Sequence, residues 1–359
     1  MGKVKEVFIS DKDAPNALAK DVRWVLEEVT KKTGFVVKEE IFRGKVHATY
    51  TLSTIIYRGT YKGKRAVLKL QGLMIETSEL DMINAFERQN KSRIIHAPAV
   101  YEFVQWSREK GYGYMISEDV GTKHIYELPF ASHEQMSGFC SFYQEYRTKA
   151  ITSPWVESKN TSLYAGFVLG DDQSKTALSA VKGAVGKWKK DAESRGRLKP
   201  GDYNKLVERF NALADSYVPR IPVSFMHREL TAQHIFVMPD GSYRLTSNLL
   251  WGYRLRWADL AYNIWKSILE IRDTNYTFEE LRVYIEDWIA AYKAIPIVKA
   301  ENDFDKIFRF VLLERVIGII LGDLGSGEQF ESEESKKHLV HLFELNRRLF
   351  DYLADMLEK

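Results

Sequence analysis

The hydrophobic pattern of this chain changes near residue 120, and that change limits the folds the chain can adopt. Before it, apolar residues alternate with a period of two and predict five strands, over residues 35–38, 54–61, 65–70, 100–104 and 112–117. Helices are expected in the same part over residues 14–33 and 77–90, and a hairpin turn at Lys62-Gly63. After Gly121 the pattern becomes mainly helical, beginning with residues 135–148, 175–193 and 202–217, with short strands expected over residues 235–237 and 243–245. We therefore expect an α+β protein with a β-rich first lobe, residues 1–120, and a helical second lobe, residues 121–359.

Composition and charge describe an ordinary globular protein. The chain has 359 residues, 45% hydrophobic and 28% charged, and its net charge of +3 gives no reason to expect nucleic acid. The single cysteine, Cys140, excludes an intramolecular disulfide and a thiolate metal cluster, and we expect it in the core rather than as a nucleophile. The N-terminus lacks a signal-like apolar run, and the most apolar segment, residues 310–321, is too short to span a bilayer. A cytoplasmic protein without a membrane segment is expected.

One loop carries the residues most suggestive of chemistry. The stretch from Phe225 to Phe236 contains His227, Glu229 and His234. Its layout is that of a phosphotransferase catalytic loop, H-R-D-x-x-x-x-N, in which the Asp accepts the hydroxyl proton and the Asn binds a metal ion. In this chain Glu229 occupies the Asp position and His234 the Asn position. The catalytic-loop-like segment spans residues 225–261.

Phosphoryl transfer also needs a cation on the phosphates and a surface for the nucleotide. Lys69, in Ala66-Val67-Leu68-Lys69, is the candidate cation, and its partner is expected to be Glu79 or, as the second choice, Glu87 on the following helix. The candidate phosphate-covering loop, residues 43–53, ends at Ser53 and has no G-x-G-x-x-G motif. The segment between the lobes is expected to face an adenine ring and supplies the remaining nucleotide-binding candidates, Ser117, Glu118 and Val120.

Together these features resemble the aminoglycoside phosphotransferase and choline kinase family. The resemblance rests on Lys69, the interlobe segment, the His227–His234 loop and Ala258-Asp259-Leu260-Ala261, which is similar to the family's D-[LI]-A motif. Glu229 and Ser247 are 18 residues apart, and Ser247 and Asp259 are 12 apart, which suits the family's bacterial antibiotic-kinase branch. The resemblance covers residues 35 to 300 and implies a bilobal protein-kinase-like fold with ATP as the cofactor, used with Mg²⁺ or Mn²⁺.

The same resemblance assigns a role to each matching position. His227 and Glu229 fall in the catalytic loop, His234 and Ser247 fall where the family has a metal-binding Asn and Asp, and Asp259 falls where an Asp supports the loop. Glu229 can still accept a proton, although a displacement of about 1 Å can lower a rate roughly 100-fold. A histidine suits softer metals than Mg²⁺, and a serine lacks the charge that fixes it. Asn248, next to Ser247, offers only an amide oxygen.

Three functions follow, and the sequence leaves them open. The first is a catalytically impaired pseudokinase that binds a nucleotide or small ligand and works through a ligand or a protein partner. The second is an active small-molecule phosphotransferase with Glu229 as the base. The third is an RNA-binding kinase-like protein, suggested by the pI near 8.6 and the basic run Lys187–Lys190 with Arg195, Arg197 and Lys199. An acceptor pocket is expected within residues 130–200 and 265–300, with acidic candidates Asp171, Asp172, Asp273, Glu279, Glu280, Glu286 and Asp287.

Overall fold

The contacts of the chain divide it into two compact units. The computed structural model describes residues 14–45, 52–74, 78–156, 173–194, 200–325 and 332–359. The first unit, here called the sheet unit, comprises residues up to 123 together with 155–157 and 236–250. The second, the helical unit, comprises residues 124–154, 158–235 and 251–359. The α+β class expected from the sequence is confirmed, but residues 236–250, expected with the helical lobe, lie in the sheet unit.

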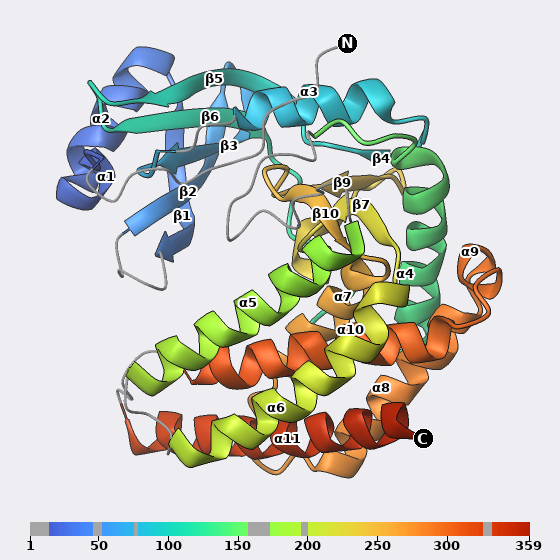
Figure 1. The fold of residues 1–359 in the computed structure, drawn as a ribbon. Helices are drawn as coiled ribbons and strands as arrows, with labels where there is room; N and C mark the ends of the chain where they lie inside the picture. The colour runs from blue at the N-terminus through green and yellow to red at the C-terminus, as the bar shows by residue number, and fades with distance from the viewer. Residues whose placement is uncertain (1–13, 46–51, 75–77, 157–172, 195–199, 326–331) are drawn as a thin grey trace. The chain divides into compact units, whose positions relative to one another are not determined.

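The sheet unit is built on an antiparallel five-stranded sheet (Figure 1). In spatial order its strands are β1 (Val36–Lys45), β2 (Leu52–Tyr61), β3 (Lys64–Gln71), β6 (Tyr112–Glu118) and β5 (Val100–Ser107). The turn between β2 and β3 falls at Lys62-Gly63, where the sequence predicts it. Both turn residues have positive φ, 49° and 77°, as a two-residue hairpin turn requires.

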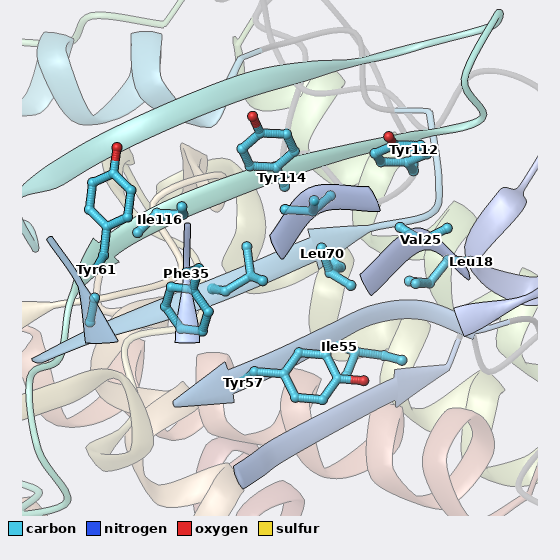
Figure 2. Close-up of a cluster of buried hydrophobic side chains, with 13 residues drawn as sticks. Leu18, Val25, Phe35, Ile55, Tyr57, Tyr61, Leu70, Tyr112, Tyr114 and Ile116 are labelled. Carbon is cyan, nitrogen blue, oxygen red and sulfur yellow. The ribbon is translucent and has the colours of Figure 1, made fainter. Parts of the chain in front are cut away.

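One face of this sheet carries the core of the unit. Figure 2 shows side chains of β2, β3 and β6 gathered with those of two short helices, α1 (Ala17–Lys20) and α2 (Val22–Thr33). The single helix expected over residues 14–33 is divided at Asp21, because the Asp21 carboxylate accepts from the Trp24 amide at 3.0 Å and caps α2. Since strand side chains alternate, burying Leu68 and Leu70 here turns Lys69 to the opposite face.

A helix and a small sheet complete the unit. Helix α3 (Glu79–Gln89) starts at Ser78, whose hydroxyl accepts from the Asp81 amide at 3.2 Å. A three-stranded sheet has the order β4 (Ile95–His96), β9 (Tyr243–Leu245), β8 (Ile235–Val237), with β4 and β9 parallel. The expected strands over 235–237 and 243–245 are therefore confirmed.

The helical unit contains long helices and one short strand pair (Figure 1). In chain order its helical elements are α4 (His133–Glu145), η1 (Tyr146–Ala150), α5 (Gln173–Ser194), α6 (Pro200–Tyr217), η2 (Val218–Arg220), η3 (Ala232–His234), α7 (Ala258–Leu269), α8 (Phe278–Lys293), α9 (Pro296–Lys299), α10 (Phe304–Gly318), η4 (Ile319–Leu324) and α11 (Glu333–Glu358). The apolar segment 310–321 lies in α10 and η4 and is buried among neighbouring helices. In the described part of the chain, no helix has both the length and the apolar character needed to cross a bilayer.

The strand pair positions the candidate catalytic loop. Strand β7 (Val223–His227) pairs with β10 (Trp251–Leu255), with His227 opposite Trp251. The sequence did not predict these strands, because Gly252 and Arg254 interrupt the apolar pattern and the pairing joins residues far apart in the chain. The loop begins where β7 ends, so the register of this pair sets the position of Glu229.

Candidate functional site

Lys69 lies at the centre of the sheet and pairs with Glu79. Strand β3 has β2 on one side and β6 on the other, with Ile56 and Met115 directly opposite Lys69. The ammonium Nζ is 2.6 Å from Glu79 Oε2, at the first residue of α3. The Lys69 side chain is 20% exposed and that of Glu79 is 6% exposed. Of the two carboxylates expected from the sequence, Glu79 is the partner, whereas Glu87 accepts from the Ala97 amide at 2.5 Å.

The other nucleotide-binding candidates occupy different environments in the sheet unit. Ser117 is buried at the end of β6, on the same face as Lys69. The Glu118 carboxylate is 3.0 Å from Arg244 Nε and accepts from the Ala99 amide at 3.2 Å, and the backbone contact expected for this residue stays a prediction. Val120 is half-buried between Asp119 and Gly121. In the candidate phosphate loop, residues 46–51 lie outside the described part, and the Ser53 hydroxyl donates to Gly44 O at 3.1 Å.

In the helical unit, His227 is a fully buried support of the loop. Its amide donates to the Tyr146 hydroxyl at 2.8 Å. Its ring meets Trp251 edge to face, with centroids 5.1 Å apart, and lies 5.9 Å from the ring of His234. The His227 side chain has no exposed surface in this structure and packs where β7 ends and the loop begins. A role of His227 in catalysis stays a prediction.

Glu229 and His234 are brought together through the main chain. His234 Nδ1 lies 2.8 Å from Glu229 O. Because a carbonyl oxygen can only accept, Nδ1 must carry the proton, and Nε2 is then the nitrogen able to accept a hydrogen bond or bind a metal ion. Burial lowers the pKa of His234 below its ordinary value, and the charges of Lys266 and His124 lower it further. The hydrogen bond to the Glu229 carbonyl and the charge of Glu229 favour the protonated ring, but they do not outweigh the burial. His234 is therefore neutral at pH 7.

The lowered pKa of His234 predicts a loss of stability in mild acid. The unfolded chain takes up this proton near pH 6.5, whereas the folded protein takes it up only at a lower pH. The contribution to stability is complete above the unfolded pKa and is lost as the pH falls toward the folded one. We expect melting curves at pH 7.5, 6.5 and 5.5 to show a midpoint that falls with the pH. His234→Asn should reduce the slope of the free energy of unfolding against pH by up to about 1.4 kcal/mol per pH unit. An unchanged slope in the variant would contradict this assignment.

Asp259 is a buried structural carboxylate. Its Oδ1 accepts from the Tyr143 hydroxyl at 2.9 Å and from the Leu260 amide at 3.1 Å, and its Oδ2 is 3.8 Å from Arg147 Nη1. Burial raises the pKa of Asp259 even though Arg147 and Tyr143 favour the ionised form. Arg147 also donates to Phe225 O at 2.9 Å, in the strand that leads into the loop. Tyr143, Tyr146 and Arg147 could not be identified from the sequence, because their contacts join distant segments.

The metal-binding candidates do not fit Mg²⁺. Ser247 has φ 58°, a strained conformation for a residue with a side chain, but offers only a hydroxyl. Asn248 is buried and its Nδ2 donates to Leu245 O at 2.8 Å. Within the described ranges, no three His, Cys, Asp or Glu side chains are grouped so as to hold a metal ion. Mg²⁺ requires oxygen ligands, usually including carboxylates, at near-ideal octahedral positions, and these residues do not supply them.

The remaining candidates from the sequence have structural surroundings. Cys140 is only partly buried rather than a full core residue, and burial raises the pKa of its thiol to about 12, so it is a poor nucleophile at neutral pH. In the basic run, Trp188 packs on Gly318 and Gly322, while Lys189 pairs with Glu193. Among the acidic candidates, Asp273, Glu279, Glu280 and Glu286 accept hydrogen bonds from neighbouring residues. Arg195, Arg197, Lys199, Asp171 and Asp172 lie outside the described part.

Comparison with known proteins identifies the fold. No protein-family model matches the sequence, and no curated protein matches it. An aminoglycoside phosphotransferase superimposes with a TM-score of 0.56 at 10% identity, covering 91% of this chain and 99% of that one. An ethanolamine kinase of Plasmodium vivax gives 0.54 at 9% identity, with 89% and 84% covered. The microcompartment-associated aminopropanol kinase gives 0.53 at 12% identity, with 94% and 99% covered. The fold is therefore the protein-kinase-like fold of small-molecule phosphotransferases.

Proposed function

We propose that this chain is a pseudokinase, a protein with the phosphotransferase fold that binds a nucleotide without a metal ion and has lost metal-dependent phosphoryl transfer. The observation that carries the proposal is the contrast between the phosphate-binding pair, which is formed, and the metal positions, which lack charged ligands. The Lys69–Glu79 pair, which phosphate binding needs, is formed at 2.6 Å. The metal positions hold Ser247, Asn248 and His234, none of which brings a negative charge.

ATP is the nucleotide that the comparisons favour. A similar aminoglycoside phosphotransferase is described in a complex with ADP and hygromycin B, and a similar amicoumacin kinase in a complex with AMP-PNP, Ca²⁺ and its substrate. In this chain the Lys69 ammonium supplies a positive charge for phosphate oxygens, and Glu79 holds that ammonium in place. Ile56 and Met115, on the same sheet face, offer apolar surface beside it. A bound nucleotide would then act as a ligand that stabilises the native state, available to a protein partner.

A titration with ATP in a thermal-shift assay tests the proposal. We expect ATP at 100 times its dissociation constant to raise the free energy of unfolding by about 2.7 kcal/mol. The shift should be as large with EDTA as with Mg²⁺ or Mn²⁺, because the metal positions lack charged oxygen ligands. No release of phosphate from ATP is expected in a parallel assay.

Two outcomes would contradict the pseudokinase assignment. A thermal shift that appears only with a divalent cation would show that the chain does assemble a metal site. Turnover of ATP that Glu229→Gln abolishes would establish the second candidate, an active phosphotransferase with Glu229 as the base. That candidate draws support from the His234 contact, which fixes the main chain at Glu229.

A further inference from the structure

Arg58 lies on the same sheet face as Lys69 and is held flat by three acceptors. In the strand register Arg58 is opposite Val67, and Ile56, two residues before it, is opposite Lys69. Its Nε donates to Asp119 Oδ1 at 3.3 Å, its Nη1 to Glu39 Oε1 at 2.8 Å and its Nη2 to Gly121 O at 3.4 Å. Because each acceptor binds a different nitrogen, the orientation of the guanidinium plane is fixed.

Asp119 is the anchor of this arrangement. Its side chain is 1% exposed and accepts from Arg58, from Arg65 Nη2 at 2.8 Å and from the Gly121 amide at 3.0 Å. Burial on its own would raise the pKa of Asp119, but the Gly121 amide and the two guanidiniums outweigh it, and the pKa is lowered. Asp119 is therefore ionised at neutral pH, and it ties Arg58 to the segment that follows β6.

The 19% of the Arg58 side chain that remains exposed is the part a ligand can reach. Three of the five N–H donors of this guanidinium are used by Asp119, Glu39 and Gly121. These bonds are made at the edge of the group, so they do not compete with the stacking of its face on an aromatic ring. Stacking does not distinguish one base from another, because every base has a π-face. Arg58 lies beside Val67, two residue pairs along the strands from Lys69, so this surface is separate from the candidate phosphate cation.

We propose that Arg58 is the stacking platform for the base of the bound nucleotide and that Asp119 is the residue that positions it. The inference rests on the proposed nucleotide binding and adds the residue that recognises the base. Lys69 then binds the phosphates, and Arg58 stacks on the base. Because stacking on the guanidinium face does not depend on the groups at the edge of the base, purine nucleotides are bound with little discrimination between adenine and guanine.

Isothermal titration calorimetry on the full chain tests this with three ligands: ATP, GTP and tripolyphosphate, which has no base. In Arg58→Leu, and equally in Arg58→Lys, ATP and GTP should each bind about 10-fold more weakly, or about 1.4 kcal/mol. The affinity for tripolyphosphate should be unchanged in Arg58→Lys, because lysine keeps the positive charge. This variant also keeps the test possible if Arg58→Leu does not fold. Arg88→Leu, which removes an exposed arginine from α3, serves as the matched control and should leave all three affinities unchanged.

The results that overturn the proposal differ from those that overturn the proposed function. Unchanged ATP affinity in both Arg58 variants, or full retention in Arg58→Lys, would show that the guanidinium plane is not the platform. An equal loss for tripolyphosphate in Arg58→Lys would show that Arg58 does not act on the base. If the unaltered protein bound neither ATP nor tripolyphosphate, nucleotide binding itself would be wrong, and this inference with it.

Discussion

Replacing Glu314 with glutamine is expected to lower the free energy of unfolding of the helical unit by about 3–5 kcal/mol. Glu314 is 2% exposed and pairs with Arg315, which is also buried, in α10. Arg315 also donates to the Tyr262 hydroxyl at 2.7 Å, and its guanidinium lies 4.8 Å from the Tyr262 ring and 5.6 Å from that of Trp188. Without the Glu314 carboxylate, the buried guanidinium keeps its aromatic neighbours but loses its directly bonded counter-charge, and the weaker attraction of Asp323 does not replace it.

Urea unfolding followed by circular dichroism measures this effect. Glu333→Gln is the matched control, because that side chain is 84% exposed at the start of α11 and its loss should change stability by less than about 0.5 kcal/mol. Changing both partners, Glu314→Met with Arg315→Met, should recover most of the loss, since apolar residues of similar volume often replace a buried pair without harm. A loss below about 1 kcal/mol in Glu314→Gln would show that water or another group reaches Arg315.

Local patterns predicted the sheet unit well. The alternation in β2 and β3 predicts both strands, and it also places Lys69 on the face opposite Leu68 and Leu70. The hairpin at Lys62-Gly63 follows from the turn residues themselves. These features could be predicted because they depend on neighbours within a few residues.

Local patterns could not decide whether Glu79 or Glu87 pairs with Lys69. Both lie on α3, and eight residues of helix separate them, so either could approach β3 depending on how the helix docks. The Ser78 cap fixes where the helix begins, and the bond from the Ala97 amide to Glu87 fixes its other end. Neither contact determines the pairing until α3 is packed on the sheet.

Contacts between distant segments account for the rest of what the sequence did not predict. Arg58 and Asp119 are 61 residues apart, and Tyr143 and Asp259 are 116 apart. The pairing of β7 with β10 is of the same kind, and so is the assignment of residues 236–250 to the sheet unit. The hydrophobic periodicity of the sequence does not predict such a contact, because the contact requires only one polar or apolar residue at each of two distant positions.

Lys69→Met is expected to weaken ATP binding by about 100-fold, the largest functional effect predicted for this chain. A charge-assisted hydrogen bond contributes about 1.5–3 kcal/mol, and the variant removes the ammonium that would make such bonds to phosphate oxygens. It also leaves Glu79, 6% exposed, without its counter-charge, so the melting midpoint should fall as well. Binding must therefore be measured by calorimetry at a temperature where both proteins are folded.

Two further variants separate the loss of the cation from the loss of the fold. Glu79→Gln keeps the ammonium but releases it from its 2.6 Å contact, so ATP binding should weaken by about 10-fold, less than in Lys69→Met. Lys64→Met removes an exposed lysine from the same strand and should leave ATP binding unchanged, because its ammonium lies near the Tyr101 ring rather than beside Glu79. If Lys69→Met bound ATP as tightly as the unaltered protein, the Lys69–Glu79 pair would be a structural ion pair alone. The role assigned to Lys69 in phosphate binding would then be wrong, and the ATP that both proteins bind would be held by other residues.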